Sequence, residues 1–229
     1  MDSNRKTAII AGVLFLTVLV SSMLHGVFSG SIDNPDYLIA ISENEKQVLT
    51  GVLLMVVLTA SVVAIPIVMF PILRKHNEIL ALGYVGARIF EGFFDVVVYG
   101  LAPLLLLTLS REFVEAGTPI DSYYQTSGAL LLALRDWASI LENFPYALGA
   151  LILNLLLYQS KLVPRWLSVW GLIGAVLMLA VGFFRMFGNS VLYLAIPIIL
   201  NELVLAIWLI VKGFNSSAIT LESAKADIN

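Results

Sequence analysis

The hydrophobic positions of the chain fall into long apolar blocks that short polar breaks separate. Six of these blocks contain at least about 18 mostly apolar residues, enough for an α-helix to cross about 30 Å of hydrocarbon. They cover residues 7–28, 48–73, 80–109, 139–159, 165–186 and 191–211. The pattern therefore predicts an all-α fold, a polytopic membrane helix bundle of six transmembrane helices.

Two of the segments between spans are longer than a turn and predict one or two short external helices. The apolar residues 37–41 are expected to form a short helix in the membrane interface, with a disordered linker as an equal alternative. Thr118, Pro119 and Asp121 have the pattern of a helix start, so the fourth helix is expected to begin outside the bilayer. Residues 1–214 are expected to form one transmembrane domain and residues 215–229 a flexible cytoplasmic tail.

The basic residues of the short loops predict the orientation of the chain. With six spans, most of them fall on one side of the membrane: Arg5, Lys6, Arg74, Lys75, Lys161, Arg165, Lys212 and Lys225. Basic residues in short loops resist translocation and stay in the cytoplasm. We therefore expect both termini to be cytoplasmic.

Composition narrows the function classes. The 229 residues are 59% hydrophobic and 13% charged, with a mean hydropathy of +0.94, which excludes an ordinary soluble enzyme. A formal net charge of -3 disfavours nucleic-acid partners. The absence of cysteine excludes disulfides, thiol catalysis and Cys-based metal or redox sites. No phosphate-binding loop or hydrolase motif occurs, so no cofactor is predicted, and Gly171 and Gly174 indicate close helix packing rather than chemistry.

The third span carries the clearest set of polar residues. A charge at bilayer depth costs at least about 2.5–3.5 kcal/mol and needs a partner or a wet cavity. Helical spacing places five polar side chains on one stripe of this span: Tyr84, Arg88, Glu91, Asp95 and Tyr99. This stripe is expected to face the interior of the bundle.

The fourth and sixth spans repeat this arrangement. Arg135 and Glu142 share one face of the fourth helix, which begins before its span, and Asn143 lies beside that face. The sixth span carries Asn201 and Glu202, with no basic residue within a turn of Glu202. The partner of Glu202 must therefore come from another helix.

Counting helical rise from the cytoplasmic ends puts Arg88 and Glu202 at a similar depth, which predicts an ion pair between the third and sixth spans. The same count puts four residues nearer the external face: His25, Asp95, Glu142 and Arg185. We therefore predict a polar chamber that opens to the outside, with Arg88 and Glu202 as its floor.

Acids outnumber bases in this predicted chamber. Crowded carboxylates cannot all ionise in a low dielectric, so at least one is expected to be protonated or to share a bound cation. The candidate ligand- or proton-binding residues are Arg88, Glu91, Asp95, Glu142, Asn143, Asn201 and Glu202, with His25, Arg135 and Arg185 at the periphery. A single histidine with scattered carboxylates is a poor metal signature, so His25 is expected to be hydrogen-bonded and no metal site is assigned.

Four stretches of the chain resemble a known family: residues 162–174 (LVPRWLSVWGLIG), residues 201–214 (NELVLAIWLIVKGF), the opening Arg5 to Ala8, and the stretch from Arg88 to Glu91. They are similar to a bacterial family of multi-pass membrane proteins, the domain-of-unknown-function family 4386, over nearly the whole chain. The resemblance implies a protein of the bacterial cytoplasmic membrane. It implies no activity, substrate or catalytic residue.

Three functions fit these observations, and they leave open whether the protein is an enzyme. The favoured one is an intramembrane site for a proton or a small cationic or amphiphilic ligand, as in a transporter, sensor or immunity-type membrane protein. The alternatives are a lipid-modifying membrane enzyme and a structural or partner-binding subunit. The expected partners are membrane lipids and a small molecule or cation, with a homo-oligomer as a further option.

Overall fold

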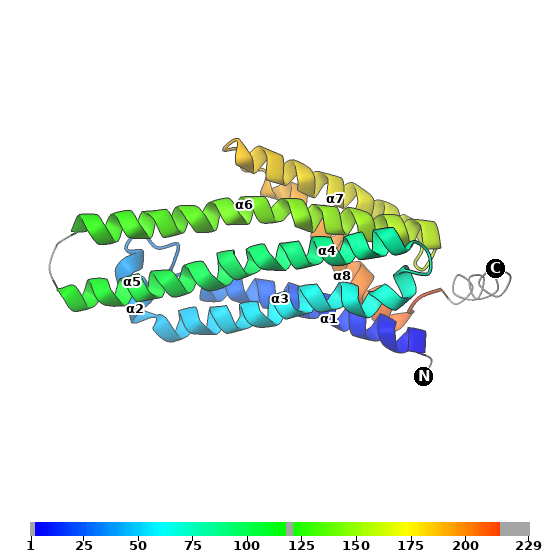
Figure 1. Cartoon of the computed structure of the whole chain (residues 1–229), viewed down its shortest axis with the longest axis horizontal. Helices are drawn as coiled ribbons and strands as arrows, with labels where there is room; N and C mark the ends of the chain where they lie inside the picture. Colours follow the sequence, from blue (N-terminus) through cyan, green and yellow to red (C-terminus); the bar gives the residue numbers. More distant parts are fainter. Residues whose placement is uncertain (1–2, 118–120, 216–229) are drawn as a thin grey trace. The chain divides into compact units, whose positions relative to one another are not determined.

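The computed structural model describes residues 3–117 and 121–215, and within them it is helical with no strand (Figure 1). The elements in chain order are α1 (Ser3–Phe28), α2 (Tyr37–Glu43), α3 (Glu45–Leu73), α4 (Glu78–Asp95), η1 (Val96–Leu101), α5 (Ala102–Ala116), α6 (Asp121–Ser160), α7 (Arg165–Met186), η2 (Leu192–Ala195) and α8 (Ile196–Val211). Thr118, Pro119 and residues 216–229, which include nearly all of the predicted tail, lie outside the described residues.

Six helical segments of the described chain are long and apolar enough to cross a membrane, which confirms the predicted fold class. The fifth, α7, has the predicted bounds. The third is longer than predicted, because α4, η1 and α5 run on without a break to Ala116. The described part of the fourth helix, α6, runs from Asp121 to Ser160 and so extends well before the predicted span of residues 139–159. Thr118 and Pro119 of the predicted helix start lie outside the described residues. The cytoplasmic placement of both termini stays a prediction.

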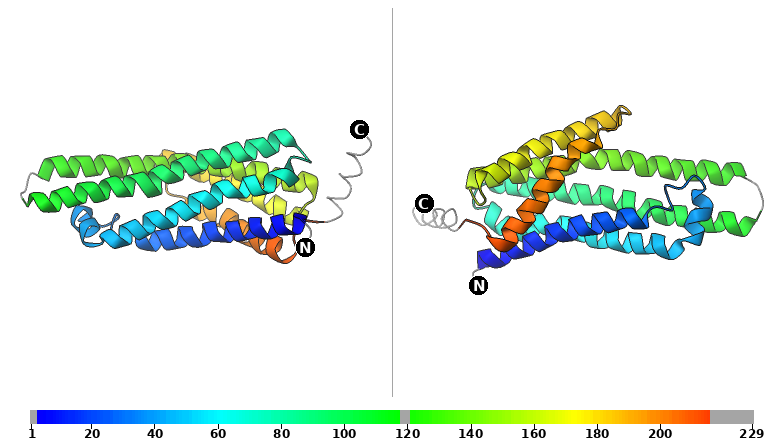
Figure 2. Two further views of the ribbon diagram at one scale, coloured as in Figure 1. Left: turned by 60° about the horizontal axis from the view of Figure 1, so that its bottom comes forward. Right: turned by 180° about the vertical axis from the view of Figure 1, so that it is seen from behind.

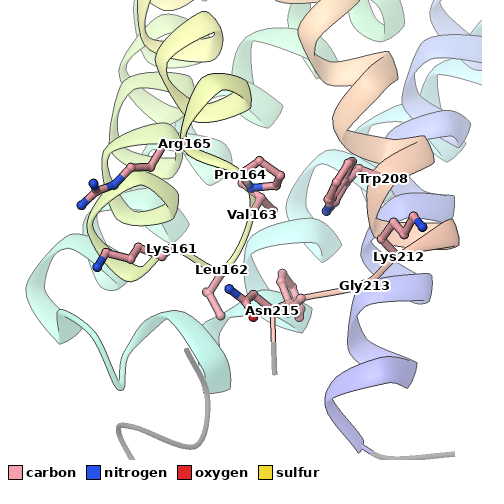
Figure 3. A pocket seen from close by; sticks show the side chains of 10 residues that line it. Lys161, Leu162, Val163, Pro164, Arg165, Trp208, Lys212, Gly213 and Asn215 are labelled. Carbon is pink, nitrogen blue, oxygen red and sulfur yellow. The ribbon is translucent and has the colours of Figure 1, made fainter. Parts of the chain in front are cut away.

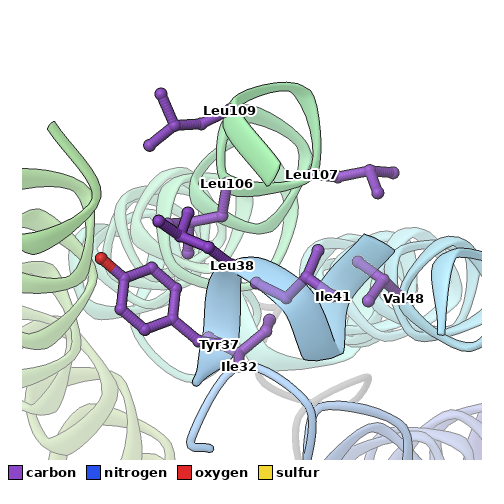
Figure 4. Close-up of a cluster of buried hydrophobic side chains, with 8 residues drawn as sticks. All are labelled: Ile32, Tyr37, Leu38, Ile41, Val48, Leu106, Leu107 and Leu109. Atoms are coloured by element: carbon purple, nitrogen blue, oxygen red, sulfur yellow. The ribbon is translucent and has the colours of Figure 1, made fainter. Parts of the chain in front are cut away.

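The short helix α2 exists, so the linker alternative for residues 37–41 is wrong. Tyr37, Leu38 and Ile41 are buried in a hydrophobic cluster with Leu106 and other leucines of α5 (Figure 4). The Ser110 hydroxyl of α5 also donates a hydrogen bond to the Leu38 carbonyl. The apolar face of α2 is therefore covered by protein, and its place in the membrane interface stays a prediction.

A π-helical turn, η1, interrupts the third span directly after Asp95. The Ala102 N–H donates to the carbonyl of Val97, five residues back. Pro103 gives the reason, because it has no N–H to offer the Tyr99 carbonyl and its ring crowds that carbonyl. The α-helical stripe predicted for this span therefore ends before Tyr99.

The described residues group into two compact units. Residues 3–17, 61–91 and 143–215 form the first, which we call the Arg88 unit. Residues 18–60, 92–117 and 121–142 form the second, which we call the Tyr99 unit. Both units take residues from the same long helices, so the prediction of a single transmembrane domain is not decided by this grouping.

Inside the Arg88 unit, α7 and α8 lie side by side (Figure 2). A Cβ atom on Gly174 would lie 2.9 Å from the Cα of Ile198, so only glycine allows this approach. A Cβ on Gly171 would lie 2.0 Å from Oδ1 of Asn154 on α6. The predicted role of these glycines in close helix packing is confirmed.

Candidate functional site

The Arg88 unit contains a buried ion-pair network. Arg88 on α4 is 2% exposed, and its Nη1 atom lies 2.9 Å from Oε1 of Glu91, one turn further along the same helix. Its Nη2 atom lies 3.2 Å from Oε1 of Glu202 on α8. The predicted ion pair between the third and sixth spans is therefore confirmed. One guanidinium serves two carboxylates in this network.

Aromatic rings and a glycine complete the surroundings of Arg88. Its guanidinium carbon lies 5.7 Å from the ring centroid of Tyr84 and 5.4 Å from that of Tyr146, distances typical of cation–π contacts. The Tyr146 hydroxyl also makes a side-chain hydrogen bond to Glu202. A Cβ on Gly149 would lie 3.5 Å from Arg88 Nε, so the backbone of α6 at Gly149 packs against the Arg88 side chain.

The other predicted site residues of this unit lie on helices that pack together. Asn201 is fully buried on α8, and its Nδ2 donates to the Leu167 carbonyl of α7 at 2.8 Å. Asn143 is buried on α6, with its Cβ 3.2 Å from where a Cβ of Gly182 would lie. Arg185 lies in the last turn of α7. Asn201 thus ties α8 to α7 by a hydrogen bond.

The Tyr99 unit contains a second polar cluster. Tyr99 is a half-buried residue, and its hydroxyl makes a side-chain hydrogen bond to Glu142 and interacts electrostatically with Asp95. Asp95 is 2% exposed at the end of α4, and Glu142 is partly buried on α6. The structure therefore brings two of the predicted carboxyl groups around one phenol.

His25 and Arg135 border the same cluster. His25 Nδ1 lies 3.1 Å from the Gly51 carbonyl, and it must donate this hydrogen bond because a carbonyl only accepts. The imidazole also packs edge-on against the Tyr99 ring, with centroids 5.0 Å apart. The expectation that His25 is hydrogen-bonded is confirmed. Arg135 forms an ion pair with Asp33, with 2.8 Å between Nη1 and Oδ1.

A cavity of about 270 Å³ opens between these residues. His25, Tyr99 and Arg135 line it together with Ser22 and Ser29. Its wall therefore combines an imidazole, a phenol, a guanidinium and two hydroxyl groups. Within residues 3–117 and 121–215, no group of three or more His, Asp or Glu side chains is placed to hold a metal ion.

The predicted site residues thus separate by unit. The Arg88 unit holds Arg88, Glu91, Asn143, Arg185, Asn201 and Glu202, and the Tyr99 unit holds His25, Asp95, Arg135 and Glu142. A single chamber that joins both sets stays a prediction.

The sequence pattern did not indicate Asp33, which shapes the cluster around Tyr99. Asp33, the partner of Arg135, lies in the loop before α2, where no periodic pattern fixes the path of the chain.

Six apolar helices with ionisable residues buried among them define this chain as a multi-pass helical membrane protein. It belongs to the family described as domain of unknown function DUF4386, whose model matches residues 10–213. Neither the curated proteins nor the solved structures contain a match to the chain.

Proposed function

We propose that this protein binds a proton or a small cationic or amphiphilic ligand at the carboxyl groups of Asp95 and Glu142, as a transporter, sensor or immunity-type membrane protein does. One observation carries the proposal. Both carboxyl groups interact with the hydroxyl of Tyr99, and all three residues belong to membrane-spanning segments. Ionisable groups at such depth are functional-site candidates by default.

The charges of the Tyr99 unit favour a cationic partner. Its polar cluster contains three carboxyl groups, from Asp33, Asp95 and Glu142, and one guanidinium, from Arg135. Arg135 contacts Asp33 directly. Two carboxylates close together in a low dielectric do not both ionise readily without a cation. A proton or a monovalent cation beside Asp95 and Glu142 offsets their mutual repulsion.

Asp95 and Glu142 do not line the neighbouring cavity, but Tyr99, with which both carboxyl groups interact, forms part of its wall. We propose that the ligand occupies this cavity beside Tyr99. The cavity volume of about 270 Å³ lies just below the range of about 300–1,000 Å³ typical of small-molecule sites. The ring of Tyr99 is an aromatic surface on which a quaternary ammonium group can bind through cation–π contact. A small organic cation suits this space better than a large amphiphile.

Two measurements on protein in lipid nanodiscs test the proposal. The first is the binding of radiolabelled tetramethylammonium at pH 8, where we expect the D95N/E142Q variant to bind at least about tenfold more weakly than the wild type. The second is a potentiometric titration from pH 8 to pH 5, where the wild type should take up more protons per chain than this variant. The matched control is E43Q/E78Q, which neutralises two exposed carboxylates.

The two measurements give different results depending on whether the proposal is right or wrong. A control variant that behaves like the wild type, beside a double variant that loses tetramethylammonium binding or proton uptake, supports the proposal. Equal cation binding and equal proton uptake in the wild type and D95N/E142Q would show that the proposal is wrong.

The Arg88 network favours a different function, a structural one. Arg88 contacts two carboxylates and two aromatic rings, so its charge is already compensated within the protein. Buried polar groups of this kind can fix the register of packed helices. We expect Glu202→Gln to lower the melting temperature while tetramethylammonium binding stays within twofold of the wild type.

A further inference from the structure

A second cavity, of about 440 Å³, lies in the Arg88 unit where the loop between α6 and α7 meets the end of α8. Figure 3 shows Lys161 and Arg165 on the side of the loop and of α7, with Trp208 and Lys212 on the side of α8. The charged ends of Lys161, Arg165 and Lys212 point outward from the space between these two sides, so basic residues border the cavity on two separate segments of the chain.

The electrostatics of this cavity favour an anion. Lys161, Arg165 and Lys212 belong to its lining, and the described lining residues include no acidic side chain. The first turn of α7 begins at Arg165, and the leading N–H groups of a helix present partial positive charge. The C-terminal carbonyls of α8 would oppose an anion, but Arg5 donates hydrogen bonds to three of them, at Leu209, Ile210 and Val211.

Backbone contacts hold the two sides of the cavity together. The Asn215 N–H donates to the Leu162 carbonyl at 2.9 Å, which ties the chain after α8 to the loop after α6. Lys161 and Gly213 both adopt positive φ, of 57° and 77°, where the chain turns out of each helix. The cavity is therefore built by two turns that are hydrogen-bonded to each other.

The surroundings of the cavity match the headgroup level of a membrane. Trp166 stacks on Trp170 and packs edge-on against Trp208, with ring centroids 6.4 and 6.5 Å apart. Tryptophans gather at the boundary between hydrocarbon and water. On α7, the exposed Val169 and Ile173 follow Arg165 by one and two turns, so an apolar surface continues from the cavity along the span.

We propose that this cavity binds the phosphate group of an anionic phospholipid, with the exposed side chains of Lys161 and Lys212 turning toward the headgroup and the apolar side chains of α7 beside an acyl chain. Arg165, whose guanidinium carbon lies 5.2 Å from the ring centroid of Tyr158, adds positive charge at the rim. Basic pockets next to transmembrane helices bind anionic headgroups in this way. Inorganic phosphate offers the same charge without an acyl chain, so the experiment must distinguish the two. The proposal is independent of the function proposed for the Tyr99 unit.

Native mass spectrometry of the protein released from nanodiscs tests this site. The lipid is phosphatidylglycerol mixed with phosphatidylcholine, and the readout is the affinity for the most strongly retained phosphatidylglycerol. Each Lys or Arg near an anionic headgroup contributes about fivefold in affinity, so K161Q/K212Q should weaken retention by about 25-fold. The matched control R74Q/K75Q removes two exposed charges that do not line the cavity and should change retention less than about twofold.

Two further arms make the result decisive. Melting temperatures in phosphatidylcholine alone should agree between the wild type and K161Q/K212Q, because both lysines are exposed and their loss leaves the fold intact. Inorganic phosphate at 10 mM, added to the wild type, should leave phosphatidylglycerol bound. Displacement of the lipid by phosphate would identify a soluble-anion site and overturn the proposal. Equal retention by K161Q/K212Q and the wild type would overturn it as well.

Discussion

The two units hold polar clusters of similar composition that differ in how their charges are balanced. In the Arg88 unit, one guanidinium contacts Glu91 on its own helix and Glu202 on α8, and two aromatic rings enclose it. In the Tyr99 unit, the guanidinium of Arg135 contacts Asp33, a side chain that is 64% exposed. The Tyr99 hydroxyl is hydrogen-bonded to Glu142 and interacts electrostatically with Asp95.

This difference suggests a rule that can be tested: the partner of the arginine separates the two clusters. Arg88 contacts two buried carboxylates, which fits the structural role proposed for its cluster. Arg135 contacts a carboxylate in a loop, which fits the proposal that a proton or a cation binds beside Asp95 and Glu142. A charged stripe on a helix is therefore not by itself a ligand site.

The largest expected effect comes from removing Arg88. Arg88→Met takes away the cation that both Glu91 and Glu202 contact, and uncompensated buried charge costs about 3–5 kcal/mol. Arg135→Gln breaks a pair whose partner is mostly exposed, which costs at most about 1 kcal/mol. Unfolding by SDS in bicelles, followed by tryptophan fluorescence, measures both free energies. Equal losses in the two variants would remove the distinction between the clusters.

A variant without any charge in the Arg88 network tests whether charge balance explains its contribution to stability. If the Arg88 network is structural, R88M/E91Q/E202Q leaves no buried charge in it and should recover at least about half of the stability lost in Arg88→Met. The same unfolding titration checks this expectation. Failure to recover would mean that the individual contacts of Arg88, and not charge balance, hold the unit together.

Alanine substitutions at two glycines test how tightly each unit is packed, and the expected losses of stability are smaller than for Arg88→Met. In the Arg88 unit, Gly174→Ala would place a Cβ against the backbone of Ile198, which cannot move aside, and should cost about 1–3 kcal/mol. In the Tyr99 unit, the Cβ of Gly128→Ala would meet only the ring end of Tyr37, a buried side chain that must shift but is less constrained than backbone, so the loss should be smaller. Melting temperatures rank the two variants, and a larger loss in Gly128→Ala would contradict this expectation.

The sequence predicted most of the fold because membrane spans obey a simple rule. Apolar length alone located all six, and α7 was predicted with its observed bounds. Hydrophobic periodicity does not reveal the π-helical turn, because it assumes a regular α-helix through Pro103, a residue that has no N–H to donate. A proline four residues after Tyr99, the last residue of the polar stripe, was the available signal.

Within the candidate site, predictability depended on where the partner residue lies. The pair of Arg88 with Glu202 followed from depth, since both residues lie in regular helices whose rise per residue is fixed. The pair of Arg135 with Asp33 did not follow, because Asp33 lies in a loop that has no period. Residue spacing along one helix does not predict how the charges group into two clusters, because this grouping depends on contacts between side chains of different segments.

The smallest expected effect concerns pH, and the two units should respond at opposite ends of the scale. In the Arg88 unit, burial and then the nearby Lys75 lower the pKa of His76 below 6.5, so its folded form binds fewer protons than its unfolded form. The stability that this provides is present above pH 6.5 and is lost as the pH falls through the folded pKa.

In the Tyr99 unit, burial raises the pKa of Tyr37 above 10, so its contribution is present below pH 10 and is lost as the pH rises. His76→Gln should therefore flatten only the acidic side of a plot of melting temperature against pH, and Tyr37→Phe only the alkaline side. A His76→Gln variant that flattens the alkaline side would contradict this assignment. Because His76 lies outside the spans and is only partly buried, its effect should be smaller than that of any glycine or arginine variant.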